Sequence, residues 1–564
     1  MTGAFAMGIE IDADMVLLNG QVITMNQQKP MAEAVAVRDG KFLWIGDTHE
    51  VRSSIGKKTL VRNLDGATVV PGFNEAHNHT MEFGLNLSGV PLESARSIGE
   101  MIQAVKDATT HVKEGNWIIG RGYNQNNFSE RRNPTRRDLD RAAPYHPVSL
   151  RHTSSHVMAV NSRALQMAGI TRETPDPPGG KIVRDKITGE LTGLLLEFPA
   201  MDLVEAVMPK PSFEDLVKAL QKAGRRLLSE GITSAMDAAV GTNGGVPRQI
   251  AAYQEAVEGG LLRVRHNLAL WSEALIDYEN FNEAMKDLER KLLGMGIRSG
   301  MGNEKLRIGP FKLVPDGALS MGTAVTYDPY GADPEDQTTG LFVIDPEKLE
   351  RVVAATHQLG WQLAVHAIGD RTLDAAITAF EKANELKDIT GARPRIEHGV
   401  MLTPQMIERI RRLGIILVPQ PGFVWGLGDS YINQLGVERA AHTKPFKTLL
   451  DNRIITAFSS DRPVIDGAPL LGIHAAVNRK TSSGQDYGPL ERISVEDALR
   501  CYTLNGAYTT FEENIKGSIE IGKLADLVLL SDNPTSVPLE RIKDIQVLAT
   551  MVDGDFVYDR ETAQ

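Results

Sequence analysis

Short apolar, strand-like segments alternate with amphipathic, helix-like segments through the middle of this 564-residue chain, and this alternation restricts its fold. Amphipathic segments such as Leu349 to Leu359 and Thr372 to Leu386 separate the strand candidates. These candidates lie at residues 67–76, 232–236, 263–270, 308–314, 362–366, 395–398, 415–419 and 454–461. Alternating β and α units favour a parallel sheet covered by helices, and eight of them close a barrel. We therefore predict an α/β fold, a (β/α)₈ TIM barrel.

The two ends of the chain show another pattern, of short strands and tight turns. Asn19-Gly20 and Asp39-Gly40 each separate two apolar runs, which is typical of β-hairpins, and Asp553-Gly554 repeats the pattern near the C-terminus. We predict a composite β-sandwich built from both termini, residues 1–70 and 513–564, with the barrel at residues 71–512.

The stretch from about residue 85 to 225 is too long for one βα unit. It mixes helix and loop signals and includes a Pro/Gly-rich run at residues 174–180. We interpret it as an insertion after the first barrel strand that covers the mouth of the barrel.

Composition narrows the function classes. The net charge is −11 and no basic stripe stands out to neutralise phosphates, which argues against nucleic acid as a partner. The single cysteine, Cys501, allows no intrachain disulfide, as suits a reducing compartment. The first lysine is Lys29, so the start lacks the basic region of a signal peptide, and no uncharged apolar run approaches membrane-spanning length. We expect a cytoplasmic homo-oligomer, a dimer, that acts on a small molecule without a membrane partner.

The histidine pair in His77-Asn78-His79 follows the first strand candidate. On a strand, side chains at i and i+2 point to the same face, so both imidazoles would converge on one point. Neutral imidazoles are ligands of divalent transition metals. Alone, such a pair is more often two solvated loop histidines, so the metal interpretation depends on the rest of the chain.

Four more polar residues fall within or at the ends of later strand candidates. Lys312 lies within the fourth, and His366, His398 and Asp461 end the fifth, sixth and eighth. Barrel enzymes build their active sites at the carboxyl ends of strands. One histidine there is usually a hydrogen-bonded structural residue, but four histidines and an aspartate at the same end of one barrel indicate a metal site.

Together these motifs resemble the amidohydrolase superfamily. The resemblance rests on Pro71-Gly72-Phe73 before the histidine pair, the strand-four lysine, the histidines of strands five and six, and Ser460-Asp461. More closely, the chain resembles the YtcJ-like branch, which includes N-substituted formamide deformylases. The supporting stretches are 117–123, 133–140, His156 with 161–165, 312–318, 366–370 and 517–526. The resemblance covers nearly the whole chain and implies a metal-dependent hydrolase.

The resemblance also implies metal ligands at the matching positions, in two sets that share a lysine: a buried set of His77, His79, Lys312 and Asp461, and an outer set of Lys312, His366 and His398. We expect two divalent ions, Zn²⁺ first, with Mn²⁺ or Co²⁺ as alternatives. Lys312 would be an N6-carboxylysine bridge, because a buried neutral amine can add carbon dioxide and become a carbamate. Two other interpretations stay open: a mononuclear site with Lys312 as a charge partner, and a lysine that reaches the barrel mouth or pairs with Asp316.

The expected reaction is hydrolysis of a C–N bond in a non-peptide amide, formamide or cyclic amide. A hydroxide shared by two metals would attack the carbonyl carbon, since metal binding lowers the pKa of water towards neutrality. Asp461 would accept the proton as general base and deliver it to the departing nitrogen as general acid. Ester, lactone or phosphoester hydrolysis by the same site is the alternative.

Two further functions are less favoured. Heterocycle deaminases among related barrels use a glutamate near the strand-five histidine, whereas His366 is followed here by Ala367-Ile368-Gly369-Asp370. A non-catalytic scaffold should be missing ligands, and this sequence lacks none of them.

Substrate selection falls to the insertion and the loops. Tyr123 and His156 lie in the insertion, and Arg479 follows the eighth strand candidate; each is a candidate for facing the cleft. Arg479 suits a carboxylate or carbonyl oxygen, although surface salt bridging explains it equally well. Glu75 departs from the family pattern, which usually has Asp there. Because that position is not a ligand, we expect an adjustment behind the ligands rather than loss of metal.

Overall fold

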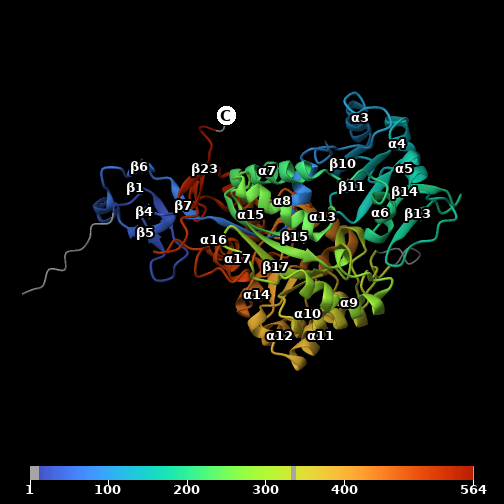
Figure 1. The fold of residues 1–564 in the computed structure, drawn as a ribbon. Helices are drawn as coiled ribbons and strands as arrows, with labels where there is room; N and C mark the ends of the chain where they lie inside the picture. Colours follow the sequence, from blue (N-terminus) through green and yellow to red (C-terminus); the bar gives the residue numbers. More distant parts are fainter. Residues whose placement is uncertain (1–11, 332–337, 563–564) are drawn as a thin grey trace, which may run out of the picture.

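A parallel sheet surrounded by helices forms the centre of the protein (Figure 1), as seen in a computed structural model that describes residues 12–331 and 338–562. Seven strands pair in the order β20-β19-β18-β17-β16-β15-β8, each parallel to its neighbours. In chain order they are β8 (Phe73–Asn78), β15 (Ile232–Val240), β16 (Arg265–Trp271), β17 (Leu306–Leu313), β18 (Leu363–Ala367), β19 (Arg395–His398) and β20 (Ile416–Val418).

An extended segment, residues 455–461, takes the eighth place without forming a regular strand. On one side Leu417 N donates to Ile455 O (3.0 Å) and Ala457 N donates to Leu417 O (2.9 Å). On the other side Asp461 N donates to His77 O (2.9 Å). The segment joins both edges of the sheet and so closes the barrel, which confirms the predicted fold.

Helices between the strands cover the outside of the barrel. The two amphipathic segments noted in the sequence form α10 (Pro346–Gln358) and α11 (Asp370–Leu386). Asp345 caps α10 by accepting from Lys348 N (3.0 Å), and Pro346 occupies its first position. Local sequence therefore determines where this helix begins.

Strands from both chain ends form two sheets beside the barrel (Figure 1). One sheet has the order β5 (Lys41–Gly46), β4 (Ala34–Arg38), β1 (Met15–Leu18), β6 (Leu60–Asn63). The other has the order β23 (Asp555–Asp559), β22 (Val547–Val552), β21 (Leu527–Leu530), β7 (Thr68–Pro71), β2 (Gln21–Ile23), β3 (Met31–Ala32). β21 pairs antiparallel with β7, so N- and C-terminal strands are direct neighbours. β7 leads through Gly72 into β8, which ties this β domain to the first barrel strand.

Two of the three predicted hairpins are present. Asp39-Gly40 joins β4 to β5, and Asp553-Gly554 joins β22 to β23. The prediction for Asn19-Gly20 was wrong, because β1 and β2 pair in different sheets. Asn19 has a φ of +58°, and a Cβ on Gly20 would lie 2.5 Å from Leu64 Cδ1. The Asn-Gly pair therefore turns a tight corner between two sheets rather than closing a hairpin.

The insertion contains a sheet of its own rather than mainly helix and loop. Its order is β13 (Lys181–Arg184), β14 (Leu191–Leu196), β12 (Val157–Val160), β11 (Val148–His152), β10 (Ile118–Tyr123), β9 (Val90–Pro91). Helices α3 (Ile98–Ala108), α4 (Arg136–Ala142), α5 (Ser162–Met167) and α6 (Phe198–Glu205) accompany it. The next helix, α7 (Phe213–Ser229), packs on α2 (Thr80–Asn86) and on β15, so it belongs to the barrel. The insertion thus ends before α7, earlier than the predicted residue 225.

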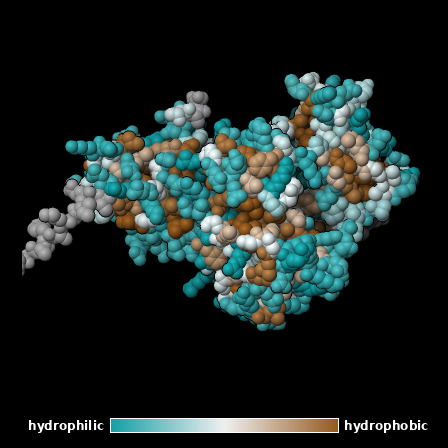
Figure 2. Space-filling view, in the orientation of Figure 1, coloured by the Kyte–Doolittle hydropathy of each residue, from teal (hydrophilic) through white to brown (hydrophobic). Residues whose placement is uncertain are grey.

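Hydrophilic side chains cover most of the face shown in Figure 2, with apolar ones scattered among them. Within the described residues, none of the helices has both the length and the apolar character that a membrane span requires.

Candidate metal centre

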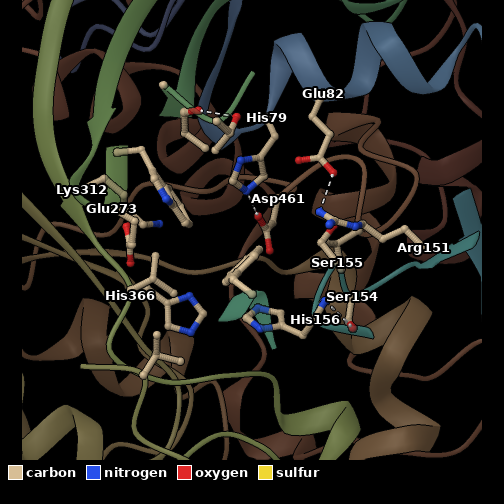
Figure 3. A pocket seen from close by; sticks show the side chains of 18 of the residues that line it. His79, Glu82, Arg151, Ser154, Ser155, His156, Glu273, Lys312, His366 and Asp461 are labelled. Carbon is tan, nitrogen blue, oxygen red and sulfur yellow. Dashed lines mark hydrogen bonds and ion pairs between the residues drawn. The ribbon is translucent and has the colours of Figure 1, made fainter. Parts of the chain in front are cut away.

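One cavity of about 300 Å³ opens at the carboxyl ends of the barrel strands (Figure 3). All six predicted metal-site residues line it: His77, His79, Lys312, His366, His398 and Asp461. They come from β8 and the residue after it, from β17, β18 and β19, and from the closing segment. The barrel topology therefore brings together residues that are up to 384 positions apart, His77 to Asp461.

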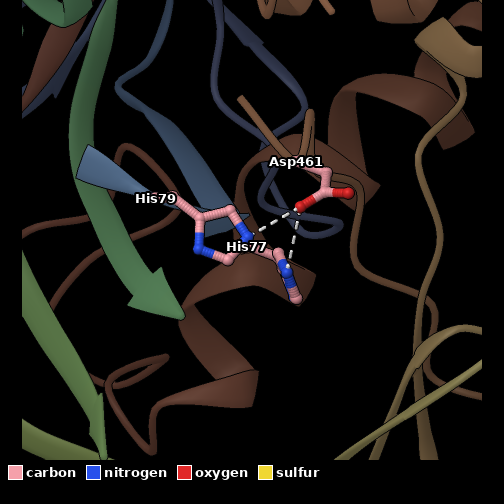
Figure 4. A group of neighbouring side chains, drawn as sticks. All are labelled: His77, His79 and Asp461. Carbon is pink, nitrogen blue, oxygen red and sulfur yellow. Dashed lines mark hydrogen bonds and ion pairs between the residues drawn. The ribbon is translucent and has the colours of Figure 1, made fainter. Parts of the chain in front are cut away.

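The tightest cluster consists of His77, His79 and Asp461 (Figure 4). One potential ligand atom from each residue lies within 4.8 Å of the others. Asp461 Oδ1 lies 3.0 Å from His79 Nε2 and 3.3 Å from His77 Nε2. The spacing predicted from the i, i+2 pattern is thus present, and the partner is the predicted aspartate.

Two of the six candidate residues, one at the end of β19 and one at the end of the closing segment, have a left-handed backbone. His398 has a φ of +73° and Asp461 a φ of +57°. Residues with a Cβ rarely adopt such values, and where they do the surrounding structure must hold them. Both side chains line the cavity.

A buried ion pair holds His77 from behind. Its Nδ1 lies 2.5 Å from Glu397 Oε2, and Arg395 Nε lies 2.8 Å from Glu397 Oε1. Burial opposes ionisation of Glu397, but the charge of Arg395 and the hydrogen bond from His77 outweigh it and bring its pKa to about 2. A carboxylate can only accept, so Nδ1 of His77 carries the hydrogen and Nε2 is left to face Asp461.

His366 and His398 are also held by hydrogen bonds from one side of the ring. His398 Nδ1 lies 2.8 Å from Gln420 Oε1, and Gln420 is held in turn by Ser459 Oγ at 2.9 Å. His366 Nε2 lies 3.1 Å from Asp316 Oδ1. Burial lowers the pKa of His366, and burial with the neighbouring His366 lowers that of His398 well below its usual range. Both rings are therefore neutral near pH 7, the form that binds a metal.

Lys312 is 1% exposed and lines the cavity. Burial lowers its pKa to about 8, even though Glu397 and Asp461 favour the charged form. The neutral amine, which is the species that can react with carbon dioxide, is therefore more populated near neutral pH than it is in an exposed lysine. Lys312 is not ion-paired with Asp316, which lies against His366 instead.

The donor set fits a divalent transition metal. In the described part of the chain, His77 Nε2 and His79 Nδ1 are buried and make no hydrogen bond. Orphaned imidazole nitrogens beside a carboxylate are costly in a folded protein unless a ligand satisfies them. Burial opposes the charge of Asp461, yet the imidazoles of His77 and His79 beside it hold its pKa well below the usual range. An anionic oxygen and two imidazoles are suitable ligands for zinc and similar ions.

The insertion supplies the opposite wall of the cavity, including Arg121, Arg151, Ser154, His156 and Phe198. His156 was predicted to face the cleft, and its ring lies 5.9 Å from that of His366.

The two other candidates for substrate contact lie elsewhere. Tyr123 is fully buried against Phe128 and His152 and does not line the cavity. Arg479 is also fully buried and donates to the backbone carbonyls of Tyr487 (2.9 Å) and Lys444 (3.1 Å). Its fork of donors is used to hold loops together, so the prediction that it faces the cleft was wrong.

Glu75 lies behind the ligands, as expected. Its Oε1 accepts from His77 N (3.2 Å) and from Ser460 N (2.9 Å). Burial raises its pKa to about 7. The side chain bridges the first strand and the closing segment, and so fixes the backbone beside His77 and Asp461.

Sequence reasoning missed the residues that orient the ligands: Asp316, Arg395, Glu397 and Gln420. A signal for one pair was present. Arg395 and Glu397 stand two apart in a short strand candidate, so they share a face, and two opposite charges on a buried strand need a partner. Asp316 and Gln420 lie in loops, where no periodicity reveals direction.

Comparison with known proteins finds relatives that match nearly the whole chain. The model of the amidohydrolase family matches residues 60–558. The chain is 33% identical to YtcJ of Bacillus subtilis, an amidohydrolase by name, over 96% of this chain and 98% of YtcJ. It is 29% identical to an N-substituted formamide deformylase of Arthrobacter pascens, over 97% and 98% of the two chains. A crystal structure of a metal-dependent hydrolase from Pyrococcus horikoshii superposes with a TM-score of 0.72 at 27% identity, covering 93% of this chain and 99% of the other. These findings confirm the resemblance predicted from the motifs.

Proposed function

The chain belongs to the amidohydrolase family, and on that premise we propose that it hydrolyses a carbon–nitrogen bond of a non-peptide amide, formamide or cyclic amide. The observation that carries the proposal is the convergence of His77, His79 and Asp461, with ligand atoms within 4.8 Å of one another, in the cavity at the barrel mouth. The likeness to a formamide deformylase over 97% of the chain favours C–N over C–O cleavage.

We propose two metal ions, with Zn²⁺ as the first expectation and Mn²⁺ or Co²⁺ as alternatives. His77, His79 and Asp461 would hold one ion, and His366 and His398, whose ring centroids are 4.4 Å apart, would hold the other. Lys312, as a carbamate, would bridge them. Such ions, when bound, supply an electrophile for the carbonyl group and a water of lowered pKa.

Asp461 is proposed as the group that moves the proton. It would accept a proton from the attacking water and deliver it to the departing nitrogen. Asp461 lines the cavity, and 7% of the residue's surface is exposed, so a substrate can reach it. Its low pKa keeps it ionised at neutral pH, the state from which it would take up the proton.

The substrate is a small molecule with an apolar part. Phe198 and Trp271 line the cavity with their rings 5.5 Å apart in an edge-to-face arrangement, and Val314 and Val464 add aliphatic surface. A pocket of about 300 Å³ accommodates a compact organic group next to the reacting bond.

The test is an activity screen of the metal-loaded protein. N-substituted formamides, N-acyl amines and cyclic amides are compared with esters, lactones and phosphoesters of the same side groups, and the released amine or alcohol is measured. Amine release favours the proposal. Cleavage of esters alone, without C–N cleavage, would replace it with the ester-hydrolase alternative.

A further inference from the structure

A histidine and a glutamate of the insertion, His156 and Glu197, form a buried pair at the cavity wall. His156 Nδ1 lies 2.6 Å from Glu197 Oε2. Glu197 is fully buried and His156 is 8% exposed, while His156 lines the cavity. Figure 3 shows the His156 ring lying between His366 and Ser154, on the side of the cavity across from Lys312. The pair is separate from the metal ligands, and the reaction proposed above makes no use of it.

The sheet of the insertion places the two residues opposite each other. β12 and β14 are antiparallel with Val157 opposite Leu196, and the ladder continues through Glu197 N, which donates to His156 O (2.9 Å). Glu197 then has a φ of +63°, unusual for a residue with a Cβ. This strained backbone turns the carboxylate back towards the imidazole, so the fold itself maintains the contact.

The pair is also docked on the barrel. A Cβ on Gly317 would lie only 2.5 Å from Glu197 Oε1 and 2.3 Å from Thr323 Oγ1, so only glycine fits. Gly317 belongs to the loop after β17, and its carbonyl lies 3.2 Å from His366 Nε2. The glutamate is therefore packed onto the same loop that contacts a proposed metal ligand. The position of His156 relative to the barrel site is fixed by this contact.

Charge determines which hydrogens the imidazole carries. Glu197 is a buried carboxylate, and among the described residues its ion-pair partner is His156. A buried carboxylate needs a cation or several donors, and here Nδ1–H is its side-chain donor. A ring balanced in this way carries hydrogen on both nitrogens, and Nε2–H is left to the cavity.

We propose that His156, positioned by Glu197, donates a hydrogen bond from Nε2 to the carbonyl oxygen of the substrate and to the oxyanion that develops there. When the attacking oxygen bonds to the carbonyl carbon, the electron pair of the C=O π bond moves onto the carbonyl oxygen. A fixed donor aimed at this position stabilises the charge where it forms. His156 is then a catalytic residue supplied by the insertion, and Glu197 is a positioning residue. The inference rests on the proposed function for the use of this cavity, and it holds for any carbonyl substrate.

The test compares wild type with His156→Phe, which removes the donor, and with His156→Gln, whose amide N–H reaches a similar place. The control is His146→Phe, because His146 lies in the same insertion but bonds Asn116 O (3.0 Å) and does not line the cavity. For whichever amide or ester is cleaved, His156→Phe should lower kcat at least tenfold with less than a threefold change in KM. His156→Gln should recover part of the loss, and Glu197→Leu should resemble His156→Phe.

A second readout does not depend on turnover. Calorimetry measures binding of O-benzyl methylphosphonate, a tetrahedral anion, and of N-benzylacetamide, a planar amide, to each metal-loaded variant. His156→Phe should weaken the phosphonate at least tenfold more than the amide, at unchanged metal content. Equal weakening of both probes, or an unchanged kcat, would overturn the proposal. Cleavage of esters but not amides would remove the proposed C–N specificity and leave this donor role standing, so the two failures are distinguishable.

Discussion

Glu397 Oε2 lies 2.5 Å from His77 Nδ1, at the back of the proposed metal centre. The contact joins β19 to β8 across the barrel interior, and Arg395 completes it by pairing with the same carboxylate. A carboxylate in this position fixes the ring and makes the opposite nitrogen a better metal ligand.

Replacing Glu397 with Gln should therefore weaken metal binding. The amide keeps the size and one acceptor but removes the charge, and we expect about a 10- to 100-fold loss of affinity. Competition with a chromophoric chelator measures it. Glu408→Gln is the control, since Glu408 is exposed and pairs with Arg411 of its own helix. Unaltered metal affinity in Glu397→Gln would show that the contact does not support the centre.

The proposed bridge makes Lys312 a second target. Lys312→Ala should lower the bound metal from two ions to one or none per chain, as measured by elemental mass spectrometry. Lys444→Met is a matched control, because Lys444 is also a fully buried lysine but does not line the cavity. If Lys312→Ala retains two ions and full activity, Lys312 is not a bridge.

The barrel and the β domain meet at Arg265, which is 2% exposed. Its Nε lies 2.7 Å from Asp526 Oδ2, and it also pairs with Asp553. Arg265→Ala leaves the buried carboxylate of Asp526 without its cation, which costs about 3–5 kcal/mol of unfolding free energy. Arg263→Ala breaks an exposed pair with Asp555 and should cost about 0–1 kcal/mol. Urea denaturation measures both, and similar losses would contradict the role of the buried network.

Asp138 makes the insertion sensitive to acid. It caps α4, accepting from Thr135 N (2.8 Å), and pairs with Arg132 at 2.8 Å. Burial opposes its charge, but the hydrogen bonds from Arg132 and Thr135 outweigh it and hold its pKa well below the usual range. A depressed folded-state pKa gives stability that is present above the unfolded pKa, about 3.9, and is lost as pH falls below it.

Protection of the α4 amides from hydrogen exchange should therefore decline as the pH falls below 4. Asp138→Asn should already lose about 1 kcal/mol at neutral pH and show a flatter acid dependence. Asp107→Asn, at an exposed position, should retain the wild-type profile. An acid dependence that is the same in Asp138→Asn and wild type would assign the effect to other groups.

The barrel, and the meeting of the six candidate residues at one cavity, were predictable because they follow from local patterns. Strand candidates, their order and the polar residues at their ends are all visible in the sequence, and parallel barrels place those ends together. The corner at Asn19-Gly20 was not predictable, since the same turn residues serve a hairpin or a change of sheet. The location of Arg479 was predicted wrongly, because the guanidinium group can donate to backbone carbonyl oxygens of loops as well as to a substrate. The role of Glu197 was not predictable, because its contact with His156, 41 positions away in the sequence, depends on the register in which two strands pair.

The most direct test of the central claim is a metal titration of the chelated wild-type protein with amine release from an N-substituted formamide recorded at each step. We expect no release without metal and a rise that saturates at about two Zn²⁺ ions per chain, with His79→Ala inactive throughout. Fewer than one tightly bound ion per chain, or a metal-loaded protein that releases amine from none of the formamides and amides in the screen, would contradict the account.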